Sequence, residues 1–327
     1  MKHDERTNLL EPNRRNFLKA GAAGAGAVLA LGAGCAARAH DQPVAQPVAA
    51  SDGYVTTSDG VRLHYIARGS GRPLVLIHGW SQSAALFREQ LAALSSRYQV
   101  IALDLRGHGE SAKPEGGYRV ARLAQDTHEA LAALGLRDFV LGAHSMGCAV
   151  VWSYLEHYGP AGISKLLLVD GSPCVTAWPG WSDDQKAEAG TFVDSKSLYE
   201  IAGGLAGADG AKVTEGFIYN AFFTKQYPRE QLAWVLAESL KLPRAYAARL
   251  LVDHCTQDWR DVIRTIRLPT LVVGGTASIF NPKSQRWIAQ QIPGSRVEIF
   301  EEAEGGGHFP FLENPAKFNR LVTEFLG

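Results

Sequence analysis

The 327-residue sequence predicts an α/β fold: a mostly parallel, doubly wound sheet of about eight strands, with helices on both faces and an inserted helical cap. Three observations predict it. Short apolar runs alternate with helical segments, as they do when helical crossovers join parallel strands. Several runs, such as 73–79, are continuously apolar, as expected of strands buried on both faces. Between Val175 and about Arg264 the alternation stops, and helical, aromatic-rich sequence replaces it.

The first two strands are predicted to form a hairpin. They lie at about 54–57 and 62–67, on either side of a Ser58-Asp59-Gly60 turn. Buried strands and helices then follow one another along the chain. We expect further strands at 73–79, 99–105, from 139, at 165–170, 270–274 and 296–300, and helices at about 84–94, 119–134, 146–158, 283–291 and 316–325.

The helical insertion divides the predicted core into two parts. The first part covers residues 53–174, the cap covers 175–264, and the second part covers 265–327. Because the cap is inserted beside the strand ends, we expect it to cover any site that lies there, while its aromatic residues also build its own core. These aromatic residues are Trp178, Trp181, Phe192, Tyr199, Phe217, Tyr219, Phe222, Phe223, Tyr227, Trp234 and Tyr246.

The amino-terminal segment has the pattern of an export signal. Twin arginines, Arg14 and Arg15, precede a weakly hydrophobic stretch that is too short and too rich in glycine to span a membrane. An Ala-x-Ala site ends at Ala39. We therefore expect a twin-arginine signal peptide over 1–39, passage through the twin-arginine translocase, a flexible leader over 40–52, and a periplasmic or secreted protein. A lipid anchor at Cys35 is the alternative.

Composition and cysteine content limit the class of protein. The formal net charge is +0 and 46% of residues are hydrophobic, which suits a soluble catalytic domain and gives no basic surface for nucleic acid. Cleavage after Ala39 would leave three cysteines, Cys148, Cys174 and Cys255. An odd number argues against a disulfide framework, so we expect buried free thiols or a single pair between Cys174 and Cys255.

Ser145 lies where an apolar strand from Phe139 breaks into a turn of small residues and then enters a helix. This is the layout of a nucleophile elbow, in which a strained turn presents a serine hydroxyl at the end of a sheet. The usual pattern is G-x-S-x-G. Here Gly147 supplies the second glycine, whereas Ala143 replaces the first.

Three other motifs lie where they can approach this serine. They are 78–80 (His-Gly-Trp), 104–111 (Asp-Leu-Arg-Gly-His-Gly-Glu-Ser) and 305–315, which contains Gly-His-Phe-Pro. Each follows a predicted strand, and in a parallel sheet such loops open at one edge. With these four motifs in this order, the sequence resembles the α/β-hydrolase family over residues 53–327.

The resemblance implies roles for particular residues. Ser145 would be the nucleophile and His308 the general base that takes the serine proton. The backbone N–H groups of Met146 and Trp80 would form the oxyanion hole. We expect three further histidines, His78, His108 and His144, to brace loops instead of acting as the base.

The carboxylate of the triad is where the sequence departs from the family. Most relatives carry an Asp in the loop after the strand equivalent to 270–274, but residues 263–296 contain no Asp or Glu. Some family members place the acid one strand earlier, at the position of Asp170 here, and we expect Asp170 to fill the role. The alternatives are Asp253 or Asp258 in the cap, or Ser278 or Asn281 orienting the ring without a carboxylate.

The predicted function is that of a serine hydrolase. It would act through an acyl-enzyme on a small ester, lactone or related acyl substrate, with no metal and no organic cofactor. A cofactor-free perhydrolase of the haloperoxidase type and a C–C bond hydrolase would use the same triad. A binding or sensing protein that keeps the pocket but turns over little is the alternative from another class.

Overall fold

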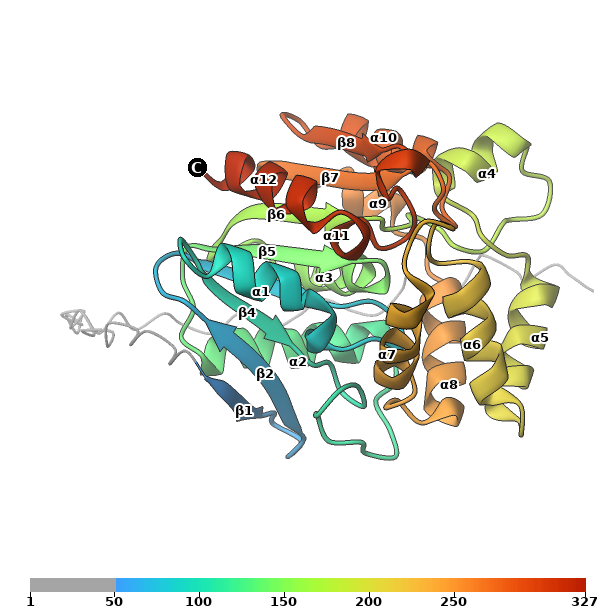
Figure 1. Ribbon diagram of the computed structural model, residues 1–327, viewed down its shortest axis with the longest axis horizontal. Coiled ribbons are helices and arrows are strands. Elements are labelled where there is room, and N and C mark those ends of the chain that lie inside the picture. The colour runs from blue at the N-terminus through green and yellow to red at the C-terminus, as the bar shows by residue number, and fades with distance from the viewer. Residues whose placement is uncertain (1–50) are drawn as a thin grey trace, which may run out of the picture. The chain divides into compact units, whose positions relative to one another are not determined.

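An eight-stranded sheet forms the centre of the computed structural model, which describes residues 51–327 (Figure 1). The strands lie in the order β1-β2-β4-β3-β5-β6-β7-β8. Their bounds are β1 Asp52–Thr56, β2 Arg62–Arg68, β3 Pro73–Ile77, β4 Gln99–Leu103, β5 Phe139–His144, β6 Ile163–Val169, β7 Thr270–Gly275 and β8 Arg296–Phe300. The β1–β2 and β2–β4 pairs are antiparallel and every other pair is parallel, which confirms the predicted fold class.

Helices cover both faces of the sheet, as predicted (Figure 1). One face carries η1 Ala84–Phe87, α1 Arg88–Leu94, α11 Pro310–Glu313 and α12 Pro315–Leu326. The other carries α2 Val120–Ala133, α3 Met146–Tyr158, α9 Arg260–Ile263 and α10 Pro282–Gln291. Each face has its own apolar core, because strands that are buried on both sides alternate their side chains between the two layers.

The inserted helices lie between β6 and β7 in the sequence and beside the carboxyl ends of the parallel strands in space (Figure 1). They are α4 Asp183–Ala189, α5 Ser195–Ala206, α6 Gly210–Asn220, α7 Arg229–Ser239 and α8 Arg244–Cys255. We call these five helices the cap. Helices α5 and α8 pack closely against each other, and α6 contacts both α5 and α7.

The expected elements and the observed ones differ in a few places. The helix expected at 84–94 is divided into η1 and α1, and its first residue, Ala84, donates its N–H to Asp104 Oδ1 at 2.7 Å. Helix α11 was not expected. The three cysteines at 148, 174 and 255 are buried free thiols, so the Cys174–Cys255 pair is not formed.

The expected signal peptide at 1–39, its twin arginines and Cys35 lie outside the described residues. The expected leader at 40–52 also lies outside them, except for its last two residues, of which Asp52 begins β1. In residues 51–327 no helix is both long and apolar enough to cross a membrane.

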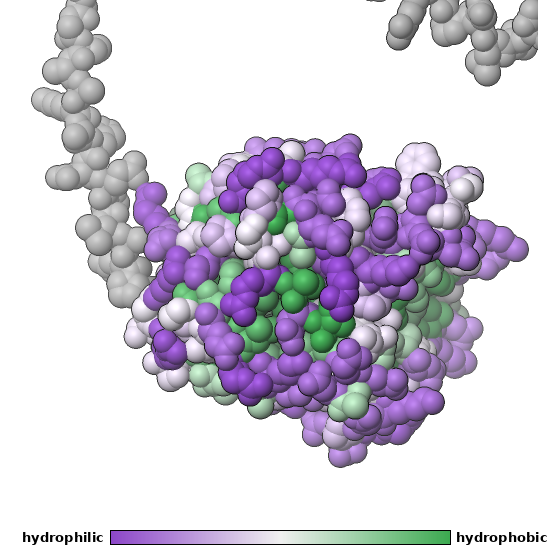
Figure 2. Space-filling view, turned by 90° about the horizontal axis from the view of Figure 1, so that it is seen from above, coloured by the Kyte–Doolittle hydropathy of each residue, from purple (hydrophilic) through white to green (hydrophobic). Residues whose placement is uncertain are grey.

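The edge strand β8 carries charged residues. Arg296 is exposed, and Glu298 is in an ion pair with Lys317 of α12 at 3.0 Å. Seen from the side of β8 and α10, most of the surface is hydrophilic, and apolar residues appear in several small areas, one of them near the centre (Figure 2). Charges on an edge strand hinder pairing with a second sheet.

Gly147 is the point where the first turn of α3 passes closest to the end of β3. A Cβ atom at this position would lie 2.6 Å from the carbonyl oxygen of Ile77 and 2.8 Å from that of His78. Both are backbone atoms, which cannot rotate away. A glycine is therefore required here if α3 and the loop after β3 are to approach each other.

Replacing Gly147 with alanine should accordingly destabilise the fold. We expect Gly147→Ala to lower the free energy of unfolding by about 1–3 kcal/mol, measured by urea denaturation, because the added methyl group must push backbone apart. Gly216→Ala in α6 is the matched control. Its Cβ meets nothing within 4 Å, so the better helix propensity of alanine should leave stability unchanged or raise it by up to about 1 kcal/mol. Equal stability of the two variants would contradict the packing argument.

Candidate active site

Three side chains from separate loops form one chain of hydrogen bonds at the carboxyl edge of the sheet. Ser145 lies between β5 and α3, Asp170 follows β6, and His308 lies between η2 (Glu302–Glu304) and α11. His308 Nε2 is 3.0 Å from Ser145 Oγ, and His308 Nδ1 is 2.5 Å from Asp170 Oδ2. The structure thus brings together the three residues expected to form the triad, in the expected order.

The backbone of Ser145 has the strained geometry that an elbow requires. Its φ is 53° and its ψ is −123°, a region that side-chain-bearing residues rarely adopt. The turn is held by the Ser145 N–H, which donates to the carbonyl of Val169 at 2.9 Å. Ala143 is buried in the core beneath α3, so a methyl group fits at this position.

Asp170 is fixed by its backbone and by a second side chain. Its φ is 47°, and its N–H donates to the carbonyl of Val273 in β7 at 2.7 Å. The Ser278 hydroxyl donates a short hydrogen bond to Asp170 Oδ2, the oxygen that also faces His308. Burial raises the pKa of Asp170 well above its usual value, and hydrogen bonding to the Ser278 hydroxyl and the Gly275 N–H offsets only part of that rise. These two donors favour the charged carboxylate in an otherwise unfavourable environment.

The other expected candidates for the acid are engaged elsewhere. Asp253 accepts the Val120 N–H at 2.8 Å, and Asp258 pairs with Arg260 at 2.6 Å. Asn281 caps α10. Of these alternatives only Ser278 reaches the His308–Asp170 pair, and it acts on the carboxylate instead of on the ring.

His308 is fully enclosed and is held from its backbone. Its N–H donates to the carbonyl of Phe222 in the cap at 2.8 Å, and its own carbonyl accepts from His144 Nε2 at 2.7 Å. Burial lowers the pKa of His308. The imidazole is therefore neutral near pH 7, the state in which Nε2 can accept a proton from Ser145.

The remaining histidines near the site brace loops, as expected. His78 uses Nδ1 on the carbonyl of Gly79 at 2.8 Å and accepts the Leu105 N–H on Nε2 at 3.1 Å. His108 accepts the Ser81 N–H at 3.3 Å. Burial lowers the pKa of both rings, which stay neutral and can accept these N–H donors.

Two backbone N–H groups lie beside Ser145 and are available to a ligand. Met146 is the first residue of α3, where N–H groups have no partner within the helix. Among the described residues the Trp80 N–H also has no acceptor. The loop after β3 touches the elbow, since a Cβ atom on Gly79 would lie 2.9 Å from Ser145 Cβ.

The loop after β3 is fastened to the cap. Trp80 Nε1 donates to the carbonyl of Ala247 at 2.9 Å, and Ser83 Oγ donates to Glu238 Oε2 at 2.6 Å. Arg244 donates to Ser81 Oγ at 2.9 Å, and burial lowers the arginine pKa to about 10. The cap and the loop after β3 therefore hold each other in place.

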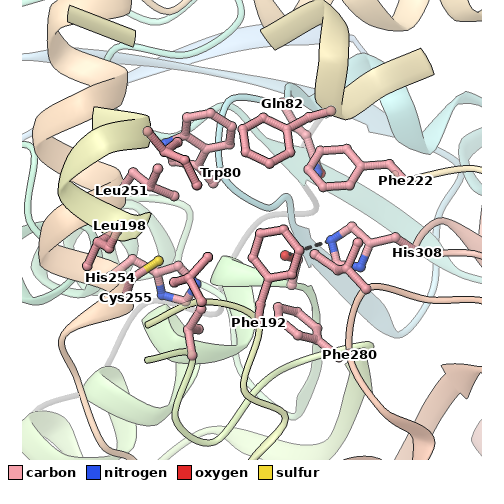
Figure 3. Close-up of a pocket in the computed structure, with 16 residues that line it drawn as sticks. Trp80, Gln82, Phe192, Leu198, Phe222, Leu251, His254, Cys255, Phe280 and His308 are labelled. Atoms are coloured by element: carbon pink, nitrogen blue, oxygen red, sulfur yellow. Dashed lines mark hydrogen bonds between the residues drawn. The ribbon is translucent and has the colours of Figure 1, made fainter. Parts of the chain in front are cut away.

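A small apolar cavity of about 50 Å³ opens onto Ser145 and His308 (Figure 3). Three of its aromatic walls, Phe192, Phe217 and Phe222, belong to the segment expected to form the cap, whereas several other aromatic residues of that segment, such as the exposed Trp178 and Tyr199, do not line it. The full lining is Trp80, Gln82, Ser145, Val175, Phe192, Val193, Leu198, Ile201, Phe217, Phe222, Leu251, His254, Cys255, Ile279, Phe280 and His308.

Two polar residues of this lining were missed by the sequence reasoning. Gln82 accepts the Gly79 N–H on Oε1 at 3.0 Å, and the same oxygen lies 3.0 Å from His144 Nδ1. His254 lies on α8, one turn after Leu250 and Leu251, on a face of that helix that is otherwise apolar. The sequence feature that could have identified His254 as a cavity residue is a single histidine on an otherwise apolar helical face.

No group of three or more His, Cys, Asp or Glu side chains within residues 51–327 is placed to hold a metal ion.

Comparisons with known proteins agree with this architecture. Residues 72–315 match the family model described as the alpha/beta hydrolase fold. A non-heme chloroperoxidase of Kitasatospora aureofaciens is 30% identical over 286 residues, covering 83% of this chain and 98% of the relative. An esterase of Exiguobacterium antarcticum superposes with a TM-score of 0.76 at 27% identity, covering 84% of this chain and 99% of the esterase. An esterase of a Rhodococcus species gives 0.71 at 26% identity, covering 84% and 98%.

The buried histidines should make the protein labile to mild acid. Burial lowers the pKa of His78, His108, His144, His254 and His308 below 6.5 in the folded state. Below that pH the unfolded chain binds more protons than the folded one, so the free energy of unfolding falls, by up to about 1.4 kcal/mol per histidine and pH unit.

We therefore expect the melting temperature to fall clearly from pH 7.5 to 5.5, because the five buried histidines outweigh the opposite contribution of Asp170 and Glu313, two buried carboxyl groups whose pKa is raised by burial. Calorimetry at four pH values measures this. Replacing His254 with leucine should make the dependence shallower, whereas replacing the exposed His157 with glutamine should not. A melting temperature that is constant or rises over this interval would contradict the account.

Proposed function

The chain belongs to the alpha/beta hydrolase fold family and is a hydrolase, and we propose that it is a serine hydrolase that acts through an acyl-enzyme on small acyl substrates. The observation that carries the proposal is the buried chain from Ser145 through His308 to Asp170. Hydroxyl, imidazole and carboxylate in this order are what activates a serine that is otherwise a poor nucleophile.

The chemistry begins with proton transfer from Ser145 Oγ to His308 Nε2, which lie 3.0 Å apart. As the proton leaves, Oγ forms a bond to the acyl carbon, and the carbonyl oxygen becomes an oxyanion. The N–H groups of Met146 and Trp80, for which no acceptor is found among the described residues, would bind that charge. His308 then gives its proton to the departing alcohol oxygen, and the acyl group stays on Ser145.

Hydrolysis of the acyl-enzyme repeats these steps with water. His308 Nε2 takes a proton from a water molecule, whose oxygen attacks the acyl carbon. The carbon–Oγ bond breaks, Oγ takes the proton back, and the acid leaves. Asp170 stays ionised throughout: it holds the Nδ1–H tautomer of His308 and balances the positive charge that the ring carries twice in each cycle.

The cavity supports a small and mainly apolar acyl group. Its aromatic and aliphatic walls offer apolar contact, and its volume of about 50 Å³ leaves room for only a few heavy atoms without movement of side chains. Esters or lactones of short acids fit this description. Long-chain lipids do not.

A second candidate activity is favoured by one comparison. The chloroperoxidase relative is 30% identical over most of both chains. The second candidate activity is perhydrolysis. Hydrogen peroxide would replace water as the acceptor of the acyl group, and the same serine and histidine would then form a peracid. Formation of peracetic acid from acetate and hydrogen peroxide by the wild type, and not by Ser145→Ala, would support this activity.

The proposal predicts that hydrolysis depends on Ser145. The chain from residue 40 should hydrolyse p-nitrophenyl acetate and butyrate with a burst of nitrophenol, and Ser145→Ala should lower the turnover number by about 10⁵-fold or more. Ala143→Gly is the matched control, since it changes the elbow without touching a reacting atom.

A fluorophosphonate should label the wild type on Ser145, as mapped by mass spectrometry of its peptides. Turnover that survives in Ser145→Ala, or a label on another residue, would refute the proposed nucleophile. Binding of the esters without serine-dependent turnover would instead favour a ligand-binding protein.

A further inference from the structure

His254 is a buried polar side chain without a partner in an otherwise apolar wall of the cavity. It is 5% exposed, and its Nδ1 is enclosed without a hydrogen bond to any described residue. Its neighbours along that wall include Leu251 and Cys255 of the same helix (Figure 3). An unpaired buried nitrogen is costly to the folded state and calls for an explanation, and a ligand bound in the cavity that His254 lines can supply the missing partner.

His254 lies across the cavity from the reacting groups. Figure 3 shows His254 and Cys255 on one side of the cavity and His308 on the other. Burial is the main cause that lowers the pKa of His254 to about 4, and His308 makes a smaller contribution. His254 is therefore neutral near pH 7, with one ring nitrogen that donates and one that accepts.

The side of the substrate that faces His254 follows from the chemistry of the triad. His308 must protonate the departing alcohol oxygen, so that oxygen lies on the His308 side of the acyl carbon. The acyl part then extends towards the opposite wall, where His254 is the one polar side chain among Leu198, Leu251 and Cys255.

We propose that His254 hydrogen-bonds an oxygen of the acyl part, so that the substrates are short hydroxy- or oxo-acyl esters or lactones instead of plain alkyl esters. This inference rests on the proposed function, because it assumes that Ser145 is acylated in this cavity. An alkyl chain would leave the ring unpaired in the complex, whereas a hydroxyl or carbonyl group would satisfy it. A site built to pair a polar group discriminates strongly against the analogue that lacks it.

The test compares matched methyl esters of four-carbon acids. The values of kcat and KM are measured by pH-stat titration for methyl butyrate, methyl 2-hydroxybutyrate, methyl 3-hydroxybutyrate and methyl 3-oxobutyrate. The enzymes are the wild type, His254→Leu, His254→Asn and Leu251→Val. Leucine removes the polar group, asparagine keeps a donor and an acceptor, and the Leu251 variant changes the same wall without changing its polarity.

The wild type should prefer at least one oxygenated ester over methyl butyrate by about 10-fold or more in kcat/KM. His254→Leu should lose about 10- to 100-fold more in kcat/KM on that ester than on methyl butyrate, so that the preference largely disappears. His254→Asn should recover part of the preference. Leu251→Val should shift all four esters by a similar factor.

Two results would overturn the inference: a wild type that shows no preference for any oxygenated ester, or a His254→Leu variant that loses the same factor on all four esters. Either result leaves the proposed function standing if methyl butyrate is hydrolysed and fluorophosphonate still labels Ser145. If Ser145 is not labelled and no ester is hydrolysed, the proposed function fails first and the inference fails with it. Labelling of Ser145 in His254→Leu at the wild-type rate shows that this variant keeps an intact site.

Discussion

The buried hydrogen bond between His308 and Asp170 is the interaction on which the rest of the site depends. The two groups meet at 2.5 Å, and both are almost completely enclosed. A charged carboxylate is costly to bury alone, so Oδ2 of Asp170 is paired with both the His308 ring and the Ser278 hydroxyl, whereas Oδ1 is enclosed without a hydrogen bond to any described residue. Removing either donor would leave the buried charge of the carboxylate with less compensation.

The need to pair the buried carboxylate explains why the loops that surround it follow neighbouring strands. Asp170 lies at the end of β6, next to β5, which ends in Ser145, and next to β7, which leads to Ser278. Parallel strands deliver all three loops to one edge, and His308 returns from the chain beyond β8 to complete the set. The cap closes the site. The Phe222 carbonyl holds the His308 backbone, and hydrogen bonds of Trp80, Ser83 and Arg244 hold the loop after β3 against α7 and α8.

The parts of this architecture that were predictable are those with a local signal. Strands β3 to β6 each contain a short apolar run. Helix α3 was predicted with the bounds that it has, because an elbow fixes where its first turn starts. The meeting of Asp170 with His308 could be expected because residues 263–296 offer no acid and because some members of the family that the sequence resembles place the acid one strand earlier. Ser278 as a donor to that carboxylate, and His254 in the wall, depend on contacts between segments far apart in sequence, which no local pattern encodes. The export signal at 1–39 stays a prediction.

The measurement that tests the account most directly is the rate of acylation in two variants: one that lacks the carboxylate at position 170, and one that carries a carboxylate at position 278 instead. Asp170→Asn should lower the acylation rate with p-nitrophenyl butyrate by about 10⁴-fold in stopped flow while the melting temperature shows a folded protein. Because Ser278 Oγ reaches the same carboxylate, Asp170→Asn combined with Ser278→Asp should regain part of the rate. Acylation by Asp170→Asn at nearly the wild-type rate would contradict the central claim that this buried carboxylate orients the His308 ring and stabilises its positive charge.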